Sequence, residues 1–310
     1  MDTNKLTVSS SPHLHAGGSV RSAMLHVLLA LAPATVFAVY YFGMTALLTV
    51  ITGVVAAVAA EAFFLWVMKK PITPVRDGSA AVTGLLLALN LPAGIALWLV
   101  AIGAGVAIGI GKLVFGGIGH NPFNPALVGR AVLVISWPAR MTAWMGPGLI
   151  SAATPLAIYR DSGNAGSYRD LFFGFIPGSI GEVSAFLLLV GGLYLLYRQI
   201  IDWKIPVTYI GTVAFMMWLL GPEGWFTGDP LFHVLSGGLM LGAFFMATDW
   251  TTSPVTKTGR IIMGVGCGLI TAVIRLYGGM VEGVSFAILL MNAFTPLIDR
   301  YTMGRRFGAR

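Results

Sequence analysis

The sequence is poor in cysteine and in charged residues, and each shortage excludes a class of protein. The single cysteine, Cys267, cannot form a disulfide within the chain or build a cysteine-rich iron–sulfur site. Only 10% of the residues are charged, against roughly 25% in soluble domains, so no sizeable soluble domain is expected. The net charge of +7 comes from basic residues scattered between apolar runs, which argues against a nucleic-acid partner.

Apolar residues and glycine are abundant instead. Hydrophobic residues make up 56% of the chain, 40 of its 310 residues are glycine, and the mean hydropathy is +0.83. Runs of about 20 apolar residues, each able to cross a roughly 30 Å hydrocarbon core, recur along nearly the whole length. The pattern predicts an all-α polytopic membrane protein with about ten transmembrane helices, at 22–42, 44–68, 77–91, 94–115, 123–140, 181–200, 205–221, 231–248, 260–278 and 283–301.

The positive charges predict which side of the membrane each connecting segment occupies. With the N-terminal arm, residues 1–20, in the cytoplasm, 14 of the 19 Lys and Arg residues fall on the cytoplasmic side, Lys112 among them. Cytoplasmic segments are enriched in Lys and Arg, so this arm and the basic tail, residues 304–310, are both expected in the cytoplasm. The longest loop, residues 141–180, is then extracytoplasmic.

Five predicted spans precede this loop and five follow it, which suggests a duplicated unit. Residues 82–90 align with residues 240–248 at an offset of 158, and residues 124–127 align with residues 285–288 at an offset of 161. A unit with an odd number of spans is inverted in its second copy. The two halves, 21–140 and 181–303, are therefore expected to form two inverted five-helix repeats.

Two stretches of the first half carry the signs of a broken helix. In Leu89–Pro92 and Gly119–Pro125, asparagine and proline interrupt apolar sequence. Inverted-repeat folds hold ligands on such broken helices near the middle of the membrane. These stretches are therefore candidate ligand sites.

The long loop contains Ser151-Ala152-Ala153-Thr154-Pro155, which has two interpretations. Threonine as an N-cap, followed by proline at the first helical position, is a common helix start. The other interpretation depends on a wider set of motifs that includes this one. They are Asp77–Ala80 with Leu89–Pro92, Asn121–Arg130, Ser151–Thr154, Met246–Asp249 and Thr295–Asp299.

With these motifs the chain resembles, over most of its length, the D subunit of the Rnf ferredoxin:NAD oxidoreductase and its relative, the B subunit of the sodium-translocating NADH:quinone reductase. That family carries a Ser/Thr-Gly-Ala-Thr motif whose last threonine bears FMN through a phosphoester bond, and the matching residue is Thr154. Two positions depart from the family pattern. Ala152 replaces the usual glycine, and Gly148 stands where flavin-transferase substrates often have aspartate.

The resemblance implies a membrane subunit of a complex that couples electron transfer between ferredoxin and NAD to Na⁺ or H⁺ translocation, without being catalytic alone. It also implies a bacterial or archaeal cytoplasmic (inner) membrane, a flavin transferase, and partner subunits that include a second flavin-bearing subunit and iron–sulfur subunits. Inverted repeats alone would equally allow a stand-alone solute channel or transporter without flavin. A membrane scaffold without a redox centre is a third interpretation.

Several polar residues are expected near a flavin. Ser151, Ala152 and Ala153 lead up to the FMN-bearing Thr154. Arg130 and Arg140, at the outer end of the fifth span, either neutralise the phosphate or anchor the span at the interface.

Three asparagines at membrane depth have two interpretations. Asn90, Asn121 and Asn124, with Pro92 close by in sequence, either cap the backbone of broken helices or hydrogen-bond to a second, non-covalent flavin such as riboflavin. A single flavin, all of it covalent, would reject the second interpretation.

Three acidic residues are candidates for an ion pathway: Glu61, Asp249 and Asp299. An unpaired charge buried in the membrane costs at least ~2.5 kcal/mol, so carboxylates near the spans suggest function. Interfacial pairing with Lys257, Arg260 or Arg300 is the alternative for Asp249 and Asp299. Ion movement through this subunit is expected to need Asp249. The histidines are not spaced as metal ligands, and no metal site is predicted.

Overall fold

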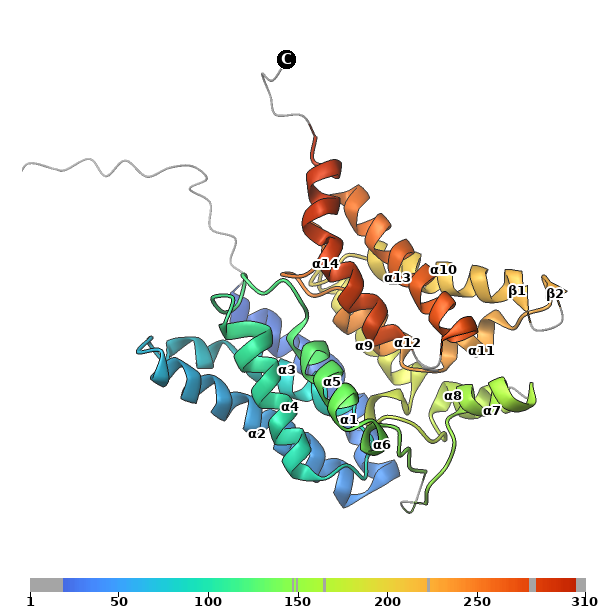
Figure 1. Cartoon of the computed structure of the whole chain (residues 1–310), viewed down its shortest axis with the longest axis horizontal. Coiled ribbons are helices and arrows are strands. Elements are labelled where there is room, and N and C mark those ends of the chain that lie inside the picture. The colour runs from blue at the N-terminus through green and yellow to red at the C-terminus, as the bar shows by residue number, and fades with distance from the viewer. Residues whose placement is uncertain are drawn as a thin grey trace, which may run out of the picture.

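The computed structural model describes residues 19–304 except 147, 149, 164, 165, 222, 223 and 279–282, so the N-terminal arm and the basic tail lie almost entirely outside the described residues. Figure 1 shows the helices of the first half gathered on one side and those of the second half on the other. The elements are α1 (Val20–Phe42), α2 (Met44–Val67), η1 (Thr73–Asp77), α3 (Ser79–Leu89), α4 (Leu97–Ile108), η2 (Gly109–Leu113), α5 (Pro125–Ser136), α6 (Pro138–Met141), α7 (Pro155–Ser162), α8 (Tyr168–Phe173), η4 (Ile180–Glu182), α9 (Ala185–Tyr197), α10 (Lys204–Leu219), β1 (Leu220–Gly221), β2 (Gly224–Trp225), α11 (Pro230–Leu235), α12 (Leu239–Leu241), η5 (Gly242–Met246), α13 (Lys257–Tyr277) and α14 (Val284–Thr302).

The longest helices coincide with predicted spans. α1, α2 and α13 have 23, 24 and 21 residues and are long and apolar enough to cross a membrane. Shorter apolar helices occupy several other predicted spans. α3, for example, has 11 residues, which rise about 16 Å, roughly half the thickness of a hydrocarbon core.

Two predicted spans are wrong as single helices. In 231–248, α11 ends at Leu235 and α12 starts at Leu239, because Gly237 and Gly238 between them take positive φ angles of 68° and 66°. In 123–140, α5 ends at Ser136 and Pro138 starts α6. Proline has no N–H to continue the ladder and disfavours helical backbone in the residue before it.

The two breaks that the sequence did predict are confirmed. α3 ends at Leu89, with Asn90 as its C-cap. Residues 119–124 are irregular, and α5 then starts at Pro125 with Asn124 as its N-cap. The Asn124 Oδ1 accepts hydrogen bonds from the backbone N–H groups of Ala126 and Leu127 at 3.0 and 3.4 Å, as an asparagine cap does.

Helices of the first half meet backbone to backbone at glycines. A Cβ atom built on Gly84 of α3 would lie 2.3 Å from the carbonyl oxygen of Gly53 in α2. One built on Gly129 of α5 would lie 2.6 Å from the carbonyl oxygen of Gly103 in α4. Larger residues would push these helices apart, so glycine sets the close approach that membrane helices use in place of a hydrophobic driving force.

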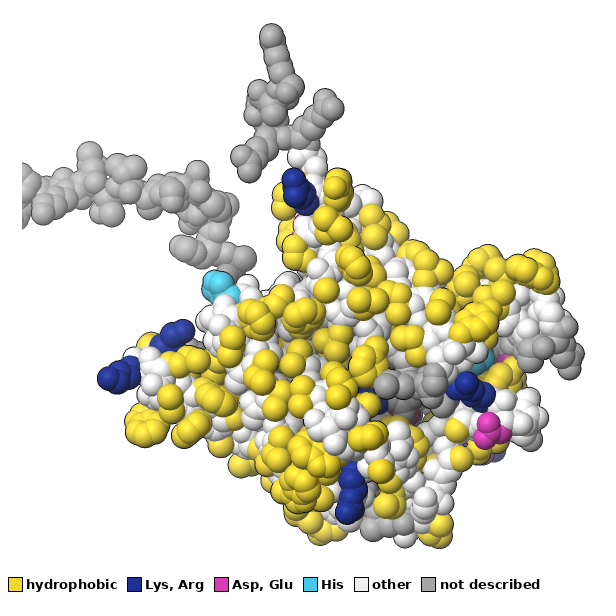
Figure 2. All heavy atoms as spheres, viewed as in Figure 1, with side chains coloured by type: hydrophobic (Ala, Val, Ile, Leu, Met, Phe, Trp, Pro, Cys, Tyr) yellow, Lys and Arg dark blue, Asp and Glu magenta, His cyan; other side chains and the backbone are white. Residues whose placement is uncertain are grey.

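The outside of the molecule is apolar. On the face seen in Figure 2, hydrophobic side chains cover both halves and most charged side chains lie near the edges. Large exposed side chains include Val36, Tyr40, Trp66, Tyr197 and Tyr301. An apolar exterior of this extent needs lipid rather than water around it, so the chain is a helical membrane protein.

Candidate functional site

α5 and α14 pack against each other where the two halves meet, and hydrogen bonds join the start of each helix to the other. At the start of α5, the backbone N–H of Asn124 donates to Asn292 Oδ1 in α14 at 3.2 Å. The Asn124 side-chain amide donates to the carbonyl oxygen of Met246, the last residue of η5, at 3.2 Å. Both asparagines are buried, so Asn124 joins the two halves with every contact away from water.

The start of α14 has a matching arrangement. Arg130 of α5 donates through one nitrogen, Nη1, to Ser285 Oγ in α14 at 2.8 Å and to Asn90 Oδ1 at 2.7 Å. Asn90 directly follows α3, and Met246 is the last residue of η5. At each end of the crossing, the linking side chain therefore also bonds to the end of a further helix. The Arg130 side chain is 8% exposed, and its guanidinium is therefore a buried positive charge at this end.

A pocket opens beside Arg130, and we call it the Thr154 pocket. It is lined by Arg130, Val134, Pro138, Met141, Thr142, Trp144, Ser151, Ala152, Ala153, Thr154, Ala157, Gly283, Ser285 and Phe286. The pocket brings the whole Ser151–Thr154 motif together with Arg130, as expected of residues that share one ligand. Arg140, the second arginine predicted here, lies on α6 with an exposed side chain and does not line the pocket.

Thr154 is the N-cap of α7, and its hydroxyl oxygen accepts a hydrogen bond from the Ala157 N–H at 3.3 Å. Pro155 occupies the first helical position, so the helix start predicted from Thr-Pro is confirmed. The side chain is 4% exposed and lines the pocket. Its hydroxyl therefore lies at the positive end of a helix dipole, where an attached anion is stabilised.

The two departures from the family motif have ordinary backbone explanations. Among the described non-glycine residues, positive φ angles occur at Lys69, Gln199 and Phe226, so Ala152 carries no strain of the kind that requires glycine. Gly148 does take a positive φ, 72°, which favours glycine there.

A second pocket lies at the Asn124 end of the crossing, and we call it the Asn124 pocket. It is lined by Ala23, Met24, Val27, Ser79, Val82, Thr83, Leu86, Lys112, Ile118, Asn121, Asn124, Pro125, Leu195, Ile200, Ile201, Phe244, Phe245, Thr248, Asp249, Trp250 and Thr251. Two of the three predicted asparagines, Asn121 and Asn124, are thus brought together. Asn90 lies instead at the Arg130 end, and Pro92 pairs with Ser179 of the long loop.

Asp249 lines the Asn124 pocket from the loop between η5 and α13. Its Oδ2 accepts hydrogen bonds from the hydroxyls of Thr251 and Thr252 at 3.0 and 3.2 Å. Loss of water around this partly buried carboxyl raises its pKa, although the two threonine hydroxyls work in the opposite direction. The sequence motif Met246–Asp249 therefore contributes a titratable group to this pocket.

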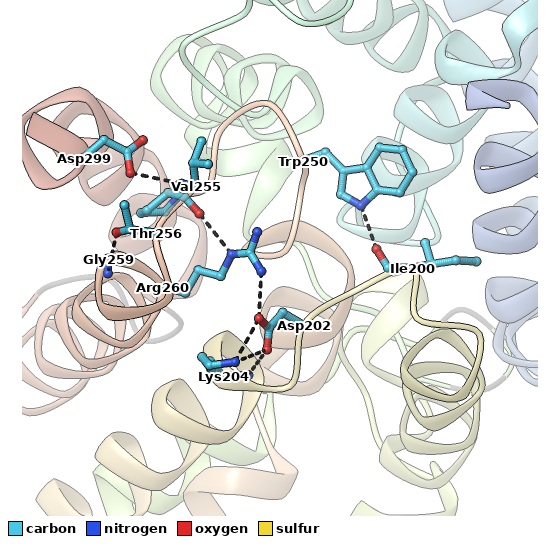
Figure 3. A network of polar contacts seen from close by, with 10 residues as sticks. Ile200, Asp202, Lys204, Trp250, Val255, Thr256, Gly259, Arg260 and Asp299 are labelled. Carbon is cyan, nitrogen blue, oxygen red and sulfur yellow. Dashed lines mark hydrogen bonds and ion pairs between the residues drawn. The ribbon is translucent and has the colours of Figure 1, made fainter. Parts of the chain in front are cut away.

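The loop that carries Asp249 is fixed at both ends (Figure 3). The Trp250 indole N–H donates to the Ile200 carbonyl at 2.7 Å, and Asp299 Oδ1 accepts from the Val255 N–H at 3.0 Å. Arg260 pairs with Asp202 at 2.7 Å, rather than with Asp249 or Asp299 as the interfacial interpretation suggested. Asp299 thus positions the loop, and its part in ion movement stays a prediction.

Glu61, the third acidic candidate, is fully buried in α2 and pairs with Lys112. The Lys112 ammonium lies 2.5 Å from Glu61 Oε1 and 2.6 Å from Ser79 Oγ. The charge pattern had assigned Lys112 to a cytoplasmic connecting segment and missed this pair. Glu61 and Lys112 are each the single charged residue of an apolar run, and this was the sequence signal that could have predicted the pair.

Arg275 was also counted as a connecting-segment charge, and the structure buries it in α13. Its guanidinium donates to the carbonyl oxygens of His233, Ser236 and Gly237 at 2.5, 3.0 and 3.2 Å. These carbonyls belong to the last turn of α11 and to the break that follows it, where the helix ladder ends. Arg275 therefore stabilises the broken helix of the second half.

Comparison with known proteins agrees with this architecture. The model of the NQR2, RnfD, RnfE family matches residues 7–308. Two relatives are 50% identical, each over 99% of this chain and 97% of their own length. They are the D subunits of the proton-translocating ferredoxin:NAD(+) oxidoreductase complex of Clostridium ljungdahlii and of the Na(+)-translocating ferredoxin:NAD(+) oxidoreductase complex of Acetobacterium woodii.

A third relative, the D subunit of the ion-translocating oxidoreductase complex of Stutzerimonas stutzeri, is 40% identical over 94% of this chain and 92% of its own length. The matches therefore run through both halves and both pockets rather than through one motif. On this full-length match, the chain belongs to the NQR2, RnfD, RnfE family.

Proposed function

We propose that this chain is a membrane subunit of an Rnf-type complex that couples electron transfer between ferredoxin and NAD to Na⁺ or H⁺ translocation. The observation that carries the proposal is the meeting of Thr154, at the start of α7, with Arg130 in one pocket. The subunit works with partners, including a second flavin-bearing subunit and iron–sulfur subunits, because its single cysteine cannot hold a cluster.

The residues of the Thr154 pocket fit FMN joined to Thr154 Oγ through its phosphate. A phosphodiester carries one negative charge, which the N-terminus of α7 and the Arg130 guanidinium both favour. Ser151, Ala152 and Ala153 form the wall beside it. The flavin supplies reversible uptake of electrons, and these residues hold and orient it.

The test is flavin fluorescence in the denatured band of the purified protein, expressed with the flavin transferase. Wild type is expected to fluoresce, and Thr154→Ala to lose all fluorescence because no hydroxyl remains. Thr142→Ala, at another threonine of the same pocket, is the matched control and is expected to keep it. A dark wild-type band would reject covalent FMN and leave two interpretations: a transporter without flavin, or a family member whose altered motif, with Ala152 and Gly148, is not modified.

For the Asn124 pocket we propose a second, non-covalent flavin, such as riboflavin. Asn121 and Asn124 bring side-chain amides to an otherwise largely apolar cavity, which is the usual composition of a cofactor site. Acid extraction of the purified subunit, followed by chromatography, would count the flavins that it releases. One flavin per subunit, all of it covalent, would contradict the proposal.

We further propose that residues 21–140 and 181–303 are inverted five-helix repeats in the cytoplasmic (inner) membrane. The matched ends of the α5–α14 crossing support this arrangement. Both termini are then cytoplasmic and the 141–180 loop is outside. A membrane-impermeant maleimide on intact cells should label a cysteine at exposed Ser162 and spare one at exposed Lys70. The reverse pattern would invert the topology.

Asp249 is proposed to serve ion movement, with Glu61 and Asp299 as further candidates. Its carboxyl lines the Asn124 pocket and is held by threonine hydroxyls. Asp249→Asn in the whole complex, reconstituted in liposomes, is expected to lower the number of ions moved per electron transferred. An unchanged ratio would reject the role.

A further inference from the structure

Four polar side chains form a continuous chain of hydrogen bonds on one side of the Asn124 pocket. Asp77 Oδ1 accepts from the Ser79 hydroxyl at 2.5 Å, and Ser79 Oγ accepts from the Lys112 ammonium at 2.6 Å. Lys112 in turn donates to Glu61 Oε1 at 2.5 Å. This hydrogen-bonded chain joins η1, α3, η2 and α2, and it includes Asp77 and Ser79 of the Asp77–Ala80 motif.

The chain links the edge of the protein to its interior. Asp77 is only partly buried, whereas Ser79, Lys112 and Glu61 are 7%, 3% and 0% exposed. Ser79 and Lys112 also line the Asn124 pocket. A proton accepted by Asp77 from water would therefore reach the pocket through two hydrogen bonds.

A purely structural ion pair explains this arrangement poorly. Burying both charges costs several kcal/mol per ion, and well-packed apolar residues are often as stable. The second carboxylate oxygen, Glu61 Oε2, is buried without a hydrogen-bond partner, which adds a further cost. Lys112 also lies in a π-helical turn, a rare conformation that is frequent at functional sites.

We propose that Asp77, Ser79, Lys112 and Glu61 form a proton relay that serves the Asn124 pocket. The inference rests on the proposed flavin there. Lys112 would hold the ammonium proton that a flavin reduced in this pocket takes up, and after giving that proton the neutral amine would stay hydrogen-bonded to Glu61. A proton from Asp77 then passes through the Ser79 hydroxyl to the amine, and Asp77 recovers its proton from water.

The present hydrogen bonds show the loaded state of this relay. The Ser79 hydroxyl donates to Asp77, and the Lys112 ammonium donates to both Ser79 and Glu61. Reloading needs the Ser79 O–H to turn and donate to the amine while it accepts from a protonated Asp77. A hydroxyl can do both, since it carries one donor and two lone pairs. Glu61 keeps the pair neutral overall when Lys112 is charged.

The first test follows flavin reduction in the purified whole complex after rapid mixing with reduced ferredoxin. Ser79→Ala removes the link but leaves both members of the Lys112–Glu61 ion pair in place, and it is expected to slow proton-coupled reduction roughly tenfold, less than the roughly 10²–10⁴-fold that general acid–base catalysis contributes. Ser79→Thr keeps the hydroxyl and should restore the rate. If the Ser79→Ala complex keeps its full flavin content and is reduced at the wild-type rate, the relay is overturned and the proposed second flavin still stands.

A second test separates the relay from a structural role. Lys112→Arg keeps the charge next to Glu61 but cannot release a proton, because a guanidinium is not deprotonated in proteins. It is expected to retain flavin and slow reduction like Ser79→Ala, whereas a structural pair predicts wild-type kinetics.

Reduced-minus-oxidised infrared spectra should also contain a Glu61 carboxylate band that is absent in Glu61→Gln, since loss of the Lys112 proton changes its hydrogen bond. No such band would overturn the proposal. A wild-type complex with only covalent flavin would overturn the relay and the second flavin together, because no proton acceptor would remain.

Discussion

The two ends of the α5–α14 crossing have similar backbone arrangements but different chemistry. At one end the Arg130 guanidinium bonds Asn90 and Ser285, next to a hydroxyl at a helix N-terminus. At the other end the residue that joins the halves is Asn124, and the pocket beside it is lined by Lys112 and Asp249. The Thr154 end offers fixed positive charge and a point of attachment. The Asn124 end offers neutral amides and groups that titrate.

The comparison shows that ligand chemistry here is decided by a few polar side chains on a shared framework. A fixed guanidinium suits a phosphate, whose charge does not change during the reaction. Amides and titratable groups suit a ring whose hydrogen-bonding needs change as it is reduced. Three substitutions test whether the two ends differ as described.

The largest effect is expected at Arg130. Arg130→Leu leaves Asn90 Oδ1 and Ser285 Oγ without this donor, and hydrogen bonds to a charged group contribute about 1.5–3 kcal/mol each. We expect a loss of roughly 3 kcal/mol in stability, seen as a lower melting temperature in detergent. Arg140→Leu, exposed on α6, is the control and should change stability by less than about 0.5 kcal/mol. Equal effects would refute the special place of Arg130.

Asn124→Ala should cost less, about 2 kcal/mol, since it removes an N-cap and a neutral hydrogen bond to Met246. Asn124→Ser retains a capping oxygen without adding a charge and loses the amide donor, so it separates the two contributions. Asn121→Ala is the matched control, because its amide bonds only to Phe123, two residues away. If thermal unfolding shows that Asn121→Ala lowers the melting temperature more than either Asn124 variant does, the crossing does not depend on Asn124.

The smallest effect is expected at Asp249. Burial raises its pKa, so the folded protein binds a proton more tightly there than the unfolded chain, whose aspartate titrates near pH 3.9. Stability contributed by this group therefore falls as the pH rises from about 4 through the raised pKa. Asp249→Asn should remove this pH dependence, and it should change the free energy of unfolding by less than about 1 kcal/mol. The melting temperature of wild type minus that of Asp249→Asn should therefore fall as the pH rises through this range. A constant difference would contradict the assignment.

Local chemistry made much of the site predictable. Thr154-Pro155 and Asn124-Pro125 start helices because a capping oxygen and a proline act within one turn, and both starts are confirmed. The breaks near Asn90 and Asn121 followed from asparagine and proline in apolar sequence. The break at Gly237-Gly238 was missed, since paired glycines also occur inside close-packed helices, as at Gly191-Gly192 of α9.

Partners far apart in sequence were not predictable. Arg130 meets Ser285, 155 positions away, and Lys112 meets Glu61 across two helices, because tertiary packing rather than a local pattern brings them together. Charge counting also misplaced Lys112 and Arg275. That rule assumes that basic residues lie in connecting segments, whereas these two are buried and bonded inside the protein.

The Asn124–Asn292 hydrogen bond has a consequence for how the protein is made. The two residues are 168 positions apart, so at about 5–20 residues per second the ribosome needs roughly 10–30 s after Asn124 before Asn292 exists. Until then the first half sits in the membrane with a buried amide still lacking its partner. The nascent chain must therefore be shielded from the lipid during that interval, by the insertion machinery or by water, and truncated chains that end before α14 are expected to be degraded.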